Sequence, residues 1–339
     1  MKTSAGRFFE DFHVGDTITH AVPRTLSGGE RALYHALYPA RGALHSSDEF
    51  ARSCGLPAAP LDDLIAFHTV LGKTVPDISL NAVANLGYAE GRWHLPVYPG
   101  DTLTATSLVI GVKENSSGQS GVVWVRSEGR NQRGALVLAF VRWVMVRKRD
   151  NSAPPPVAVV PVLAGSIDQA ALVVPRGLDF SRYDFALAGE RHRWGDYVVG
   201  EKIDHGDAVT IEEAEHMLAT RLWQNTARVH FDGSARQRLI YGGHIISLAR
   251  ALSFNGLANA QLLVALNGGT HANPCAAGDT VRAWSEVLGK AATQAPGVAA
   301  LRLRLVAVKG GSGFDLQGPD GRYLPQVLLD LDYWALIPV

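Results

Sequence analysis

An internal repeat constrains the fold of this chain more than any other feature. Residues 11–18 (DFHVGDTI) recur as residues 196–203 (DYVVGEKI), and residues 100–111 (GDTLTATSLVIG) recur as residues 278–289 (GDTVRAWSEVLG). Seven of the twelve positions in the second pair are identical, and the two offsets, 185 and 178 residues, are nearly equal. Two matches in the same order at similar spacing indicate one duplicated domain rather than a solenoid.

The length of the chain agrees with two copies, because 339 residues suffice for about two domains of ordinary size. Between the copies lies the segment 151–161 (NSAPPPVAVVP). Its three consecutive prolines cannot continue a helix or a central strand. We therefore expect an N-terminal repeat at residues 1–150, an extended Pro-rich linker at 151–175 and a C-terminal repeat at 176–339.

Each copy contains one helix with a strong apolar face, followed by β-rich segments. The first helix is expected to begin near Pro60, and the second is indicated by apolar residues at helical spacing from Ile245 to Leu252. The expected strands are residues 121–127, 136–147, 300–308 and 327–334. One apolar helix followed by long antiparallel strands predicts an α+β unit in which the sheet wraps around the helix.

The composition argues against several classes of protein. Lys plus Arg and Asp plus Glu each number 32, so the chain has no general charge that would attract nucleic acid or an anionic membrane. Cys54 and Cys275 match no metal-binding spacing and are expected to be inert thiols. The N-terminus has no apolar secretory signal, and the apolar run 136–146 is short and interrupted by Arg142. The simplest expected location is the cytoplasm.

Groups able to do acid–base chemistry are concentrated in residues 224–232 (QNTARVHFD), which contain Asn225, Arg228 and His230. Soon afterwards Gly242 and Gly243 open the second apolar helix. Glycines at a helix N-terminus expose backbone N–H groups and the positive end of the helix dipole. These groups can polarise a carbonyl, which is what stabilising an enolate requires, although both residues could also be simple turn glycines.

These motifs resemble those of the MaoC-like hydratases, whose motif G-D-x-N-P-x-H-x-D precedes a glycine-containing turn into a central hot-dog helix. By this resemblance His230 falls on the catalytic histidine of the family, Asn225 on its catalytic aspartate and Asp232 on its trailing acid. Residues 96–102 and 274–280 resemble the strand entry P-V-x-P-G-D-T of the same family. The resemblance covers the whole chain and implies a double hot-dog fold and an acyl-CoA substrate.

The chain departs from the family pattern at the aspartate. Hydration needs a base for water and an acid for the α-carbon, and Asn225 cannot take up a proton, although it can orient a water molecule. Either His230 works mostly alone, or another carboxylate such as Asp232 or Glu215 replaces the aspartate. In the first copy, His45 corresponds to the catalytic histidine of the motif. Ala40 replaces the aspartate of the family there, and Ser47 replaces its trailing acid. The first copy is therefore expected to be degenerate and to form a substrate-binding wall.

Three stretches, residues 72–91, 113–118 and 239–252, resemble the mesaconyl-CoA hydratases (β-methylmalyl-CoA dehydratases) within this family. That resemblance implies reversible hydration of mesaconyl-CoA to β-methylmalyl-CoA, in acetyl-CoA assimilation by the ethylmalonyl-CoA route or in a related carbon cycle. The substrate carries a second carboxylate, which needs a cation or several donors when buried. Arg228 is the expected partner, and Arg221 and Arg41 are weaker candidates. No metal or redox cofactor is expected, since the chain has no GxGxxG after a strand and no GxxxxGK(S/T) motif. CoA enters as part of the substrate.

Three other functions stay open from the sequence. A general (R)-specific enoyl-CoA hydratase would prefer straight-chain substrates. A hot-dog acyl-CoA thioesterase would release free CoA, because one fold can host both reactions. An inactive acyl-CoA-binding protein would bind CoA esters without turnover. The family resemblance is compatible with a homodimer and gives no reason to expect a nucleic-acid or membrane partner.

Overall fold

A computed structural model of the protein describes residues 2–231, 233, 238–311 and 313–339, so Asp232 lies outside the described residues. Within them the backbone forms ten strands, five from each half of the chain. The strands are β1 (Thr17–Thr25), β2 (Ala82–Trp93), β3 (Thr102–Glu114), β4 (Ser120–Arg130), β5 (Leu136–Arg147), β6 (Lys202–Thr210), β7 (Leu262–His271), β8 (Thr280–Ala292), β9 (Val298–Lys309) and β10 (Val327–Pro338). The four segments predicted as strands are confirmed as β4, β5, β9 and β10.

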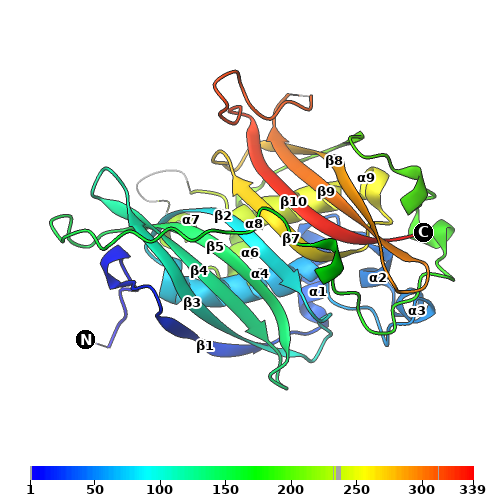
Figure 1. Ribbon diagram of the computed structural model, residues 1–339, viewed down its shortest axis with the longest axis horizontal. Coiled ribbons are helices and arrows are strands. Elements are labelled where there is room, and N and C mark those ends of the chain that lie inside the picture. Colours follow the sequence, from blue (N-terminus) through cyan, green and yellow to red (C-terminus); the bar gives the residue numbers. More distant parts are fainter. Residues whose placement is uncertain (1, 232, 234–237, 312) are drawn as a thin grey trace.

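All ten strands belong to one antiparallel sheet with the order β1-β3-β4-β5-β2-β7-β10-β9-β8-β6 (Figure 1). The order β1-β3-β4-β5-β2 of the first half is repeated in the second half as β6-β8-β9-β10-β7. Strands β2 and β7 pair at the middle, from Gly87 opposite Thr270 to Arg92 opposite Ala265, and so join the two halves. The second half therefore repeats the topology of the first.

The two apolar helices predicted from the sequence are α4 (Asp63–Thr74) and α8 (Gly242–Leu252), which lie behind the sheet in Figure 1. Helix α4 begins three residues after Pro60 because Asp62 caps it, its side chain accepting a hydrogen bond from the N–H of Leu64 at 2.9 Å. Both helices contribute to one large core together with the inner face of the sheet. The predicted α+β arrangement is confirmed. The remaining α-helices are α1 (Gly28–Leu37), α2 (Ala43–Ser46), α3 (Asp48–Ser53), α5 (Phe185–Ala188), α6 (Glu213–Leu222), α7 (Arg228–Phe231) and α9 (Phe254–Leu257).

The Gly-Asp-Thr repeat forms the same turn before β3 and before β8. Gly100 has a φ of 100° and Gly278 a φ of 91°, values that a residue with a Cβ atom rarely adopts. The following aspartate closes each turn by accepting a hydrogen bond from the backbone N–H three residues earlier, at 2.9 Å for Asp101 and 3.0 Å for Asp279. The most obvious sequence repeat is therefore explained by turn geometry.

The Pro-rich segment after β5 runs in front of the sheet in Figure 1. Val159 pairs with Val112 of β3 in an isolated antiparallel bridge, and the N–H of Ala164 donates to Glu90 of β2 at 2.9 Å. Gly111 leaves the room for this crossing, because a Cβ atom there would press on Pro161 and on the carbonyl oxygen of Val159. The segment is thereby held against the outer face of the first half.

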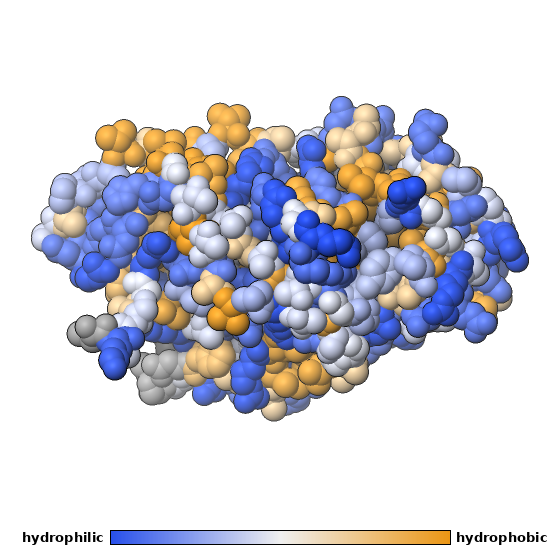
Figure 2. Space-filling model, turned by 90° about the horizontal axis from the view of Figure 1, so that it is seen from below, coloured by the Kyte–Doolittle hydropathy of each residue, from blue (hydrophilic) through white to orange (hydrophobic). Residues whose placement is uncertain are grey.

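The surface seen from below in Figure 2 is mostly hydrophilic, with hydrophobic residues in separate small areas. Among the residues that the structure describes, we find no helix with the length and apolar character needed to span a bilayer.

Candidate active site

A cavity of about 290 Å³ lies between the two repeats. The first repeat supplies the end of α4, the π-helical turn Val75–Ser79 that follows it, and parts of β2 and β5. The second repeat supplies α7, the start of α8 and the end of β7. The wall of the cavity is mainly apolar, and polar side chains reach it from both repeats. The ones that matter here are Asn85, Tyr88, Arg142, Asn225, His230 and His271.

The connection from α6 to α7 places the predicted catalytic segment at this cavity. Gln224 has a φ of 56°, a left-handed conformation that is uncommon for a residue with a side chain. The backbone of Trp223 packs directly on Gly72 of α4, where an added Cβ atom would overlap the carbonyl oxygen of Trp223. The first repeat thus fixes the turn that orients Asn225 and His230, both of which line the cavity.

His230 is set up as a neutral acceptor. Its side chain is buried, and burial lowers its pKa to about 4, so the ring is neutral at pH 7. Nδ1 donates a hydrogen bond to the carbonyl oxygen of Leu239 at 2.7 Å, which fixes the tautomer and makes Nε2 the acceptor nitrogen. A buried neutral imidazole with a fixed tautomer can accept a proton from water in the cavity.

Asn225 is 3% exposed, and its Oδ1 accepts a hydrogen bond from the N–H of Ala227 at 3.3 Å. No Asp or Glu side chain lines the cavity within the described parts of the chain. Glu215, one proposed replacement for the missing aspartate, lies on α6 and is not part of the wall. Asp232, the second proposed replacement, lies outside the described residues. The identity of a replacement acid stays a prediction.

The two glycines at the start of α8 face different surroundings. Gly242 lines the cavity, and a Cβ atom there would overlap the ring of His271. Gly243 is buried and does not line the cavity, and a Cβ atom there would overlap the ring of Tyr241. Neither glycine has a positive φ, so a turn conformation does not explain why glycine is needed at these positions. The reason is that a ring packs against each of them too closely for a Cβ atom. The first N–H groups of a helix have no acceptor within it, which leaves the one at Gly242 available to a ligand.

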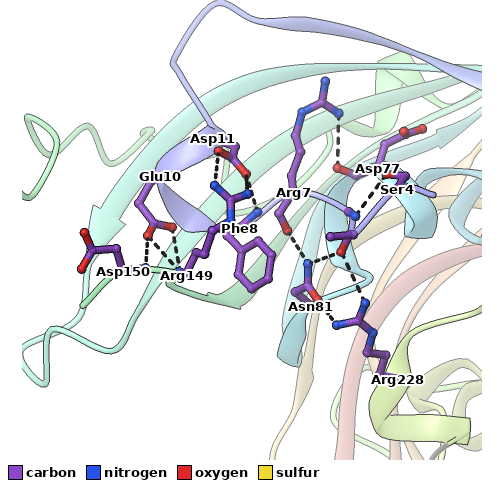
Figure 3. Close-up of polar contacts among 12 residues, drawn as sticks. Ser4, Arg7, Phe8, Glu10, Asp11, Asp77, Asn81, Arg149, Asp150 and Arg228 are labelled. Atoms are coloured by element: carbon purple, nitrogen blue, oxygen red, sulfur yellow. Dashed lines mark hydrogen bonds and ion pairs between the residues drawn. The ribbon is translucent and has the colours of Figure 1, made fainter. Parts of the chain in front are cut away.

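Arg228 lies outside the inner cavity, in an adjoining groove of about 660 Å³. The groove and the cavity share lining residues, among them Val229, Leu239 and Cys275. Figure 3 shows the Arg228 side chain beside Asn81, whose Oδ1 accepts a hydrogen bond from Nη1 at 2.7 Å. Asn81 in turn holds the N-terminal segment by donating to the carbonyl oxygens of Ala5 at 2.9 Å and Arg7 at 3.0 Å. A role for Arg228 in binding a substrate carboxylate stays a prediction.

The outer groove is basic. Besides Arg228 it is lined by Arg147, Arg238 and Lys309. Arg238 pairs with Glu213 at 2.5 Å and Lys309 with Asp279 at 3.2 Å. For Arg147 and Arg228, no carboxylate of the described chain comes within 4.0 Å. The groove therefore adjoins the cavity and contains two cations, Arg147 and Arg228, that have no carboxylate partner within the described ranges and suit a polyanion.

The polar residues that the first repeat contributes were not among those predicted from the sequence. Three of these residues line the cavity: Arg142 of β5, and Asn85 and Tyr88 of β2. The hydroxyl oxygen of Tyr88 lies 3.2 Å from Nε2 of His271. One signal was present for Arg142, because it interrupts an apolar strand in phase with Phe140 and Val144, which are buried. The weaker candidates Arg41 and Arg221 do not line the cavity.

The corresponding place in the first repeat is nearly filled. The hollow beside His45 measures only about 30 Å³. Nε2 of His45 lies 3.6 Å from a carboxylate oxygen of Asp63, and Asp63 also accepts a hydrogen bond from the N–H of Leu263 at 2.8 Å. An acyl group has no room there.

The comparisons with known proteins decide the family. The protein-family model described as mesaconyl-CoA hydratase matches residues 2–308 of the chain. A mesaconyl-CoA hydratase of Cereibacter sphaeroides is 74% identical over 342 aligned residues, with 100% of both chains covered. The chain belongs to the mesaconyl-CoA hydratase family. A β-methylmalyl-CoA dehydratase of Chloroflexus aurantiacus is a further relative. Its sequence is 56% identical, and the alignment covers 99% of this chain and 98% of the relative.

Solved structures agree with the family assignment. A crystal structure of a putative MaoC domain protein dehydratase from Chloroflexus aurantiacus superimposes on this mesaconyl-CoA hydratase family member with a TM-score of 0.96, at 56% identity and with 100% of this chain and 99% of the other covered. A conserved hypothetical protein of Mycobacterium tuberculosis, described as a double hotdog fold, gives a TM-score of 0.74 at 24% identity, covering 98% of each chain. The predicted MaoC-like relationship and double hot-dog fold are confirmed.

Two further features of this family member bear on its chemistry. Cys54 and Cys275 are both free and buried, as expected, and burial raises the pKa of the Cys275 thiol to about 12. Cys275 is thus a thiol, not a thiolate, at neutral pH. Among the described residues, no group of three or more His, Cys, Asp or Glu side chains is arranged to hold a metal ion.

Proposed function

We propose that this protein catalyses the reversible addition of water to mesaconyl-CoA, giving β-methylmalyl-CoA. The observation that carries the proposal is the 74% identity to a mesaconyl-CoA hydratase over the full length of both chains, together with a cavity that contains His230 and the N-terminus of α8. Mesaconyl-CoA is an α,β-unsaturated thioester, so water adds at the β-carbon and the electrons of the double bond move into a thioester enolate. The protein must stabilise this enolate and move one proton.

In the proposed mechanism the thioester carbonyl oxygen accepts a hydrogen bond from the N–H of Gly242, at the positive end of the α8 dipole. Water between Asn225 and His230 forms the new C–O bond. Its proton goes to Nε2 of His230, which is neutral and whose other nitrogen is already occupied by Leu239. The enolate then takes a proton at the α-carbon, and His230 returns to the neutral state. Gly243 supports the helix start through its packing on the ring of Tyr241.

We further propose that the CoA portion lies in the basic outer groove. CoA carries a pyrophosphate and a 3′-phosphate, and Arg147 and Arg228, which have no carboxylate partner among the described residues, suit such groups. The shared lining between groove and cavity supports a single extended site, with phosphates outside and the acyl group inside. In this arrangement the first repeat serves as a binding wall, consistent with the small hollow at His45.

The proposal is tested by mixing the purified protein with mesaconyl-CoA, following the enoyl-thioester absorbance and weighing the products by mass spectrometry. Loss of absorbance with the gain of one water is the expected result. Release of free CoA would instead make the protein a thioesterase. Turnover of crotonyl-CoA alone would keep the reaction class and discard the substrate. Tight binding without turnover of either ester would identify an acyl-CoA-binding protein.

A further inference from the structure

Arg142 is a buried cation in the wall of the cavity, and no carboxylate of the described residues pairs with it. It lies in the middle of β5, paired across the sheet with Tyr88 of β2 and Val125 of β4, and it is 1% exposed. Burial lowers its pKa to about 10, which leaves it cationic at pH 7. No Asp or Glu of the described residues comes within 4.0 Å of its guanidinium group. A buried charge without a counter-ion costs several kcal/mol, so its presence calls for an explanation.

Neutral groups satisfy only part of the guanidinium. Nη2 donates to Thr74 Oγ1 at 2.7 Å and to Ser79 Oγ at 3.2 Å, and Nη1 donates to Asn85 Oδ1 at 3.3 Å. Nε has no acceptor among the described residues. A guanidinium has five N–H donors, so this one retains both charge and hydrogen-bonding capacity.

Asn85 adds a second donor at the same place. Its Oδ1 accepts from Arg142, which turns its amide nitrogen away from that contact, and Nδ2 is buried without an acceptor among the described residues. Asn85 and Arg142 both line the cavity. Two adjacent side chains with unsatisfied donors, one of them cationic, are what a buried carboxylate requires.

We propose that Arg142, supported by Asn85, binds the free carboxylate of a dicarboxylic acyl-CoA and thereby selects such substrates over monocarboxylic enoyl-CoA esters. This inference rests on the proposed function, since the carboxylate of mesaconyl-CoA is attached to the β-carbon that receives water. Binding it would hold that carbon in a fixed position within the cavity that contains His230. Arg228, the candidate from sequence, would then serve the CoA phosphates in the outer groove.

The test compares kcat/KM for mesaconyl-CoA with kcat/KM for crotonyl-CoA, which lacks the carboxylate. Removing one partner of a buried, hydrogen-bonded charge pair costs enough to change the ratio of the two values by at least ~30-fold. We expect Arg142→Met to lower the ratio by that factor, and Arg228→Met, the matched control in the outer groove, to lower both values alike. A selective loss with Arg228→Met and none with Arg142→Met would overturn the proposal and assign the carboxylate to Arg228.

A second variant guards against misfolding of Arg142→Met. Asn85→Asp preserves the volume, places an anion beside Arg142 that neutralises the guanidinium, and replaces the Nδ2 donor by an oxygen that repels the substrate carboxylate. We expect the same selective loss of mesaconyl-CoA turnover, and an unchanged ratio would contradict the proposal.

A binding measurement on the wild-type protein separates this inference from the proposed function. Succinyl-CoA and butyryl-CoA are saturated, so neither can be hydrated, and they differ in the terminal carboxylate. We expect succinyl-CoA to bind at least ~30-fold more tightly by calorimetry. Equal binding would refute the carboxylate site even if mesaconyl-CoA is hydrated. Preferential binding without hydration would retain the site and reject the proposed reaction.

Discussion

Mild acid should unfold this protein, because several buried histidines are neutral in the folded state. Each of them is at most 8% exposed, and burial lowers the pKa values to about 3 or 4. They are His68, His205, His216, His230 and His244. In the unfolded chain a histidine titrates with a pKa of about 6.5. Between these values the unfolded state binds protons that the folded state excludes, so stability is present above pH 6.5 and is lost as the pH falls.

The magnitude follows from these pKa values. At pH 5, a histidine with a folded pKa of about 4 destabilises the protein by ~2 kcal/mol relative to pH 7.5. Five such groups contribute roughly 10 kcal/mol. Asp63 acts in the opposite direction, because burial raises the pKa of its carboxyl to about 7 and the folded state takes up its proton first. It offsets about one histidine. The net loss is comparable with the total stability of a typical domain, about 5–15 kcal/mol.

Urea denaturation at pH 7.5, 6.5, 5.5 and 5.0, followed by intrinsic fluorescence, measures this effect as a falling transition midpoint. His205→Gln is the control variant, because His205 lies outside the cavity and is held by Asn255 and Ser285. Removing one titrating group should reduce the slope of stability with pH by ~1.4 kcal/mol per pH unit below pH 6. Equal midpoints at pH 5.0 and 7.5 would refute the reasoning, as would a His205→Gln slope identical to that of the wild type.

Three further predictions follow from single contacts. His230→Gln should lower kcat for mesaconyl-CoA by about 10²–10⁴-fold while leaving the melting temperature close to that of the wild type, and a kcat near the wild-type value would exclude His230 as the base. Gly72→Ala, which in an open helix would stabilise by ~1 kcal/mol, should instead destabilise by about 1–3 kcal/mol because the methyl group overlaps the Trp223 carbonyl; a higher melting temperature would show that the turn can move. Gly278→Ala should cost ~1–2 kcal/mol in thermal denaturation because of its positive φ, whereas Gly268→Ala, also in open space but without a positive φ, should not; equal effects would contradict the turn argument.

Much of the candidate site could be predicted from the sequence because its residues lie close together in the chain. The segment from Asn225 to His230 and the glycines opening α8 are close in the chain, so their identities and spacing could be recognised without knowing the fold. The structure places Asn225, His230 and Gly242 in one cavity. It places Gly243 and Arg228 outside that cavity, because ring packing turns Gly243 away and the hydrogen bond to Asn81 holds Arg228 at the outer groove.

The sequence by itself determined the duplication, the α+β class, the two apolar helices α4 and α8, and the four strands β4, β5, β9 and β10. These follow from periodicity, turn residues and internal repetition, which act over a few residues at a time. Only the tertiary structure decided that the first repeat supplies Arg142 and Asn85 to a cavity whose other wall comes from the second. Their contact with the site depends on strand order and on the pairing of β2 with β7, which join residues far apart in the chain. An arginine in an apolar strand shows in sequence only that a charge is buried, and the pairing of the strands decides what that charge faces.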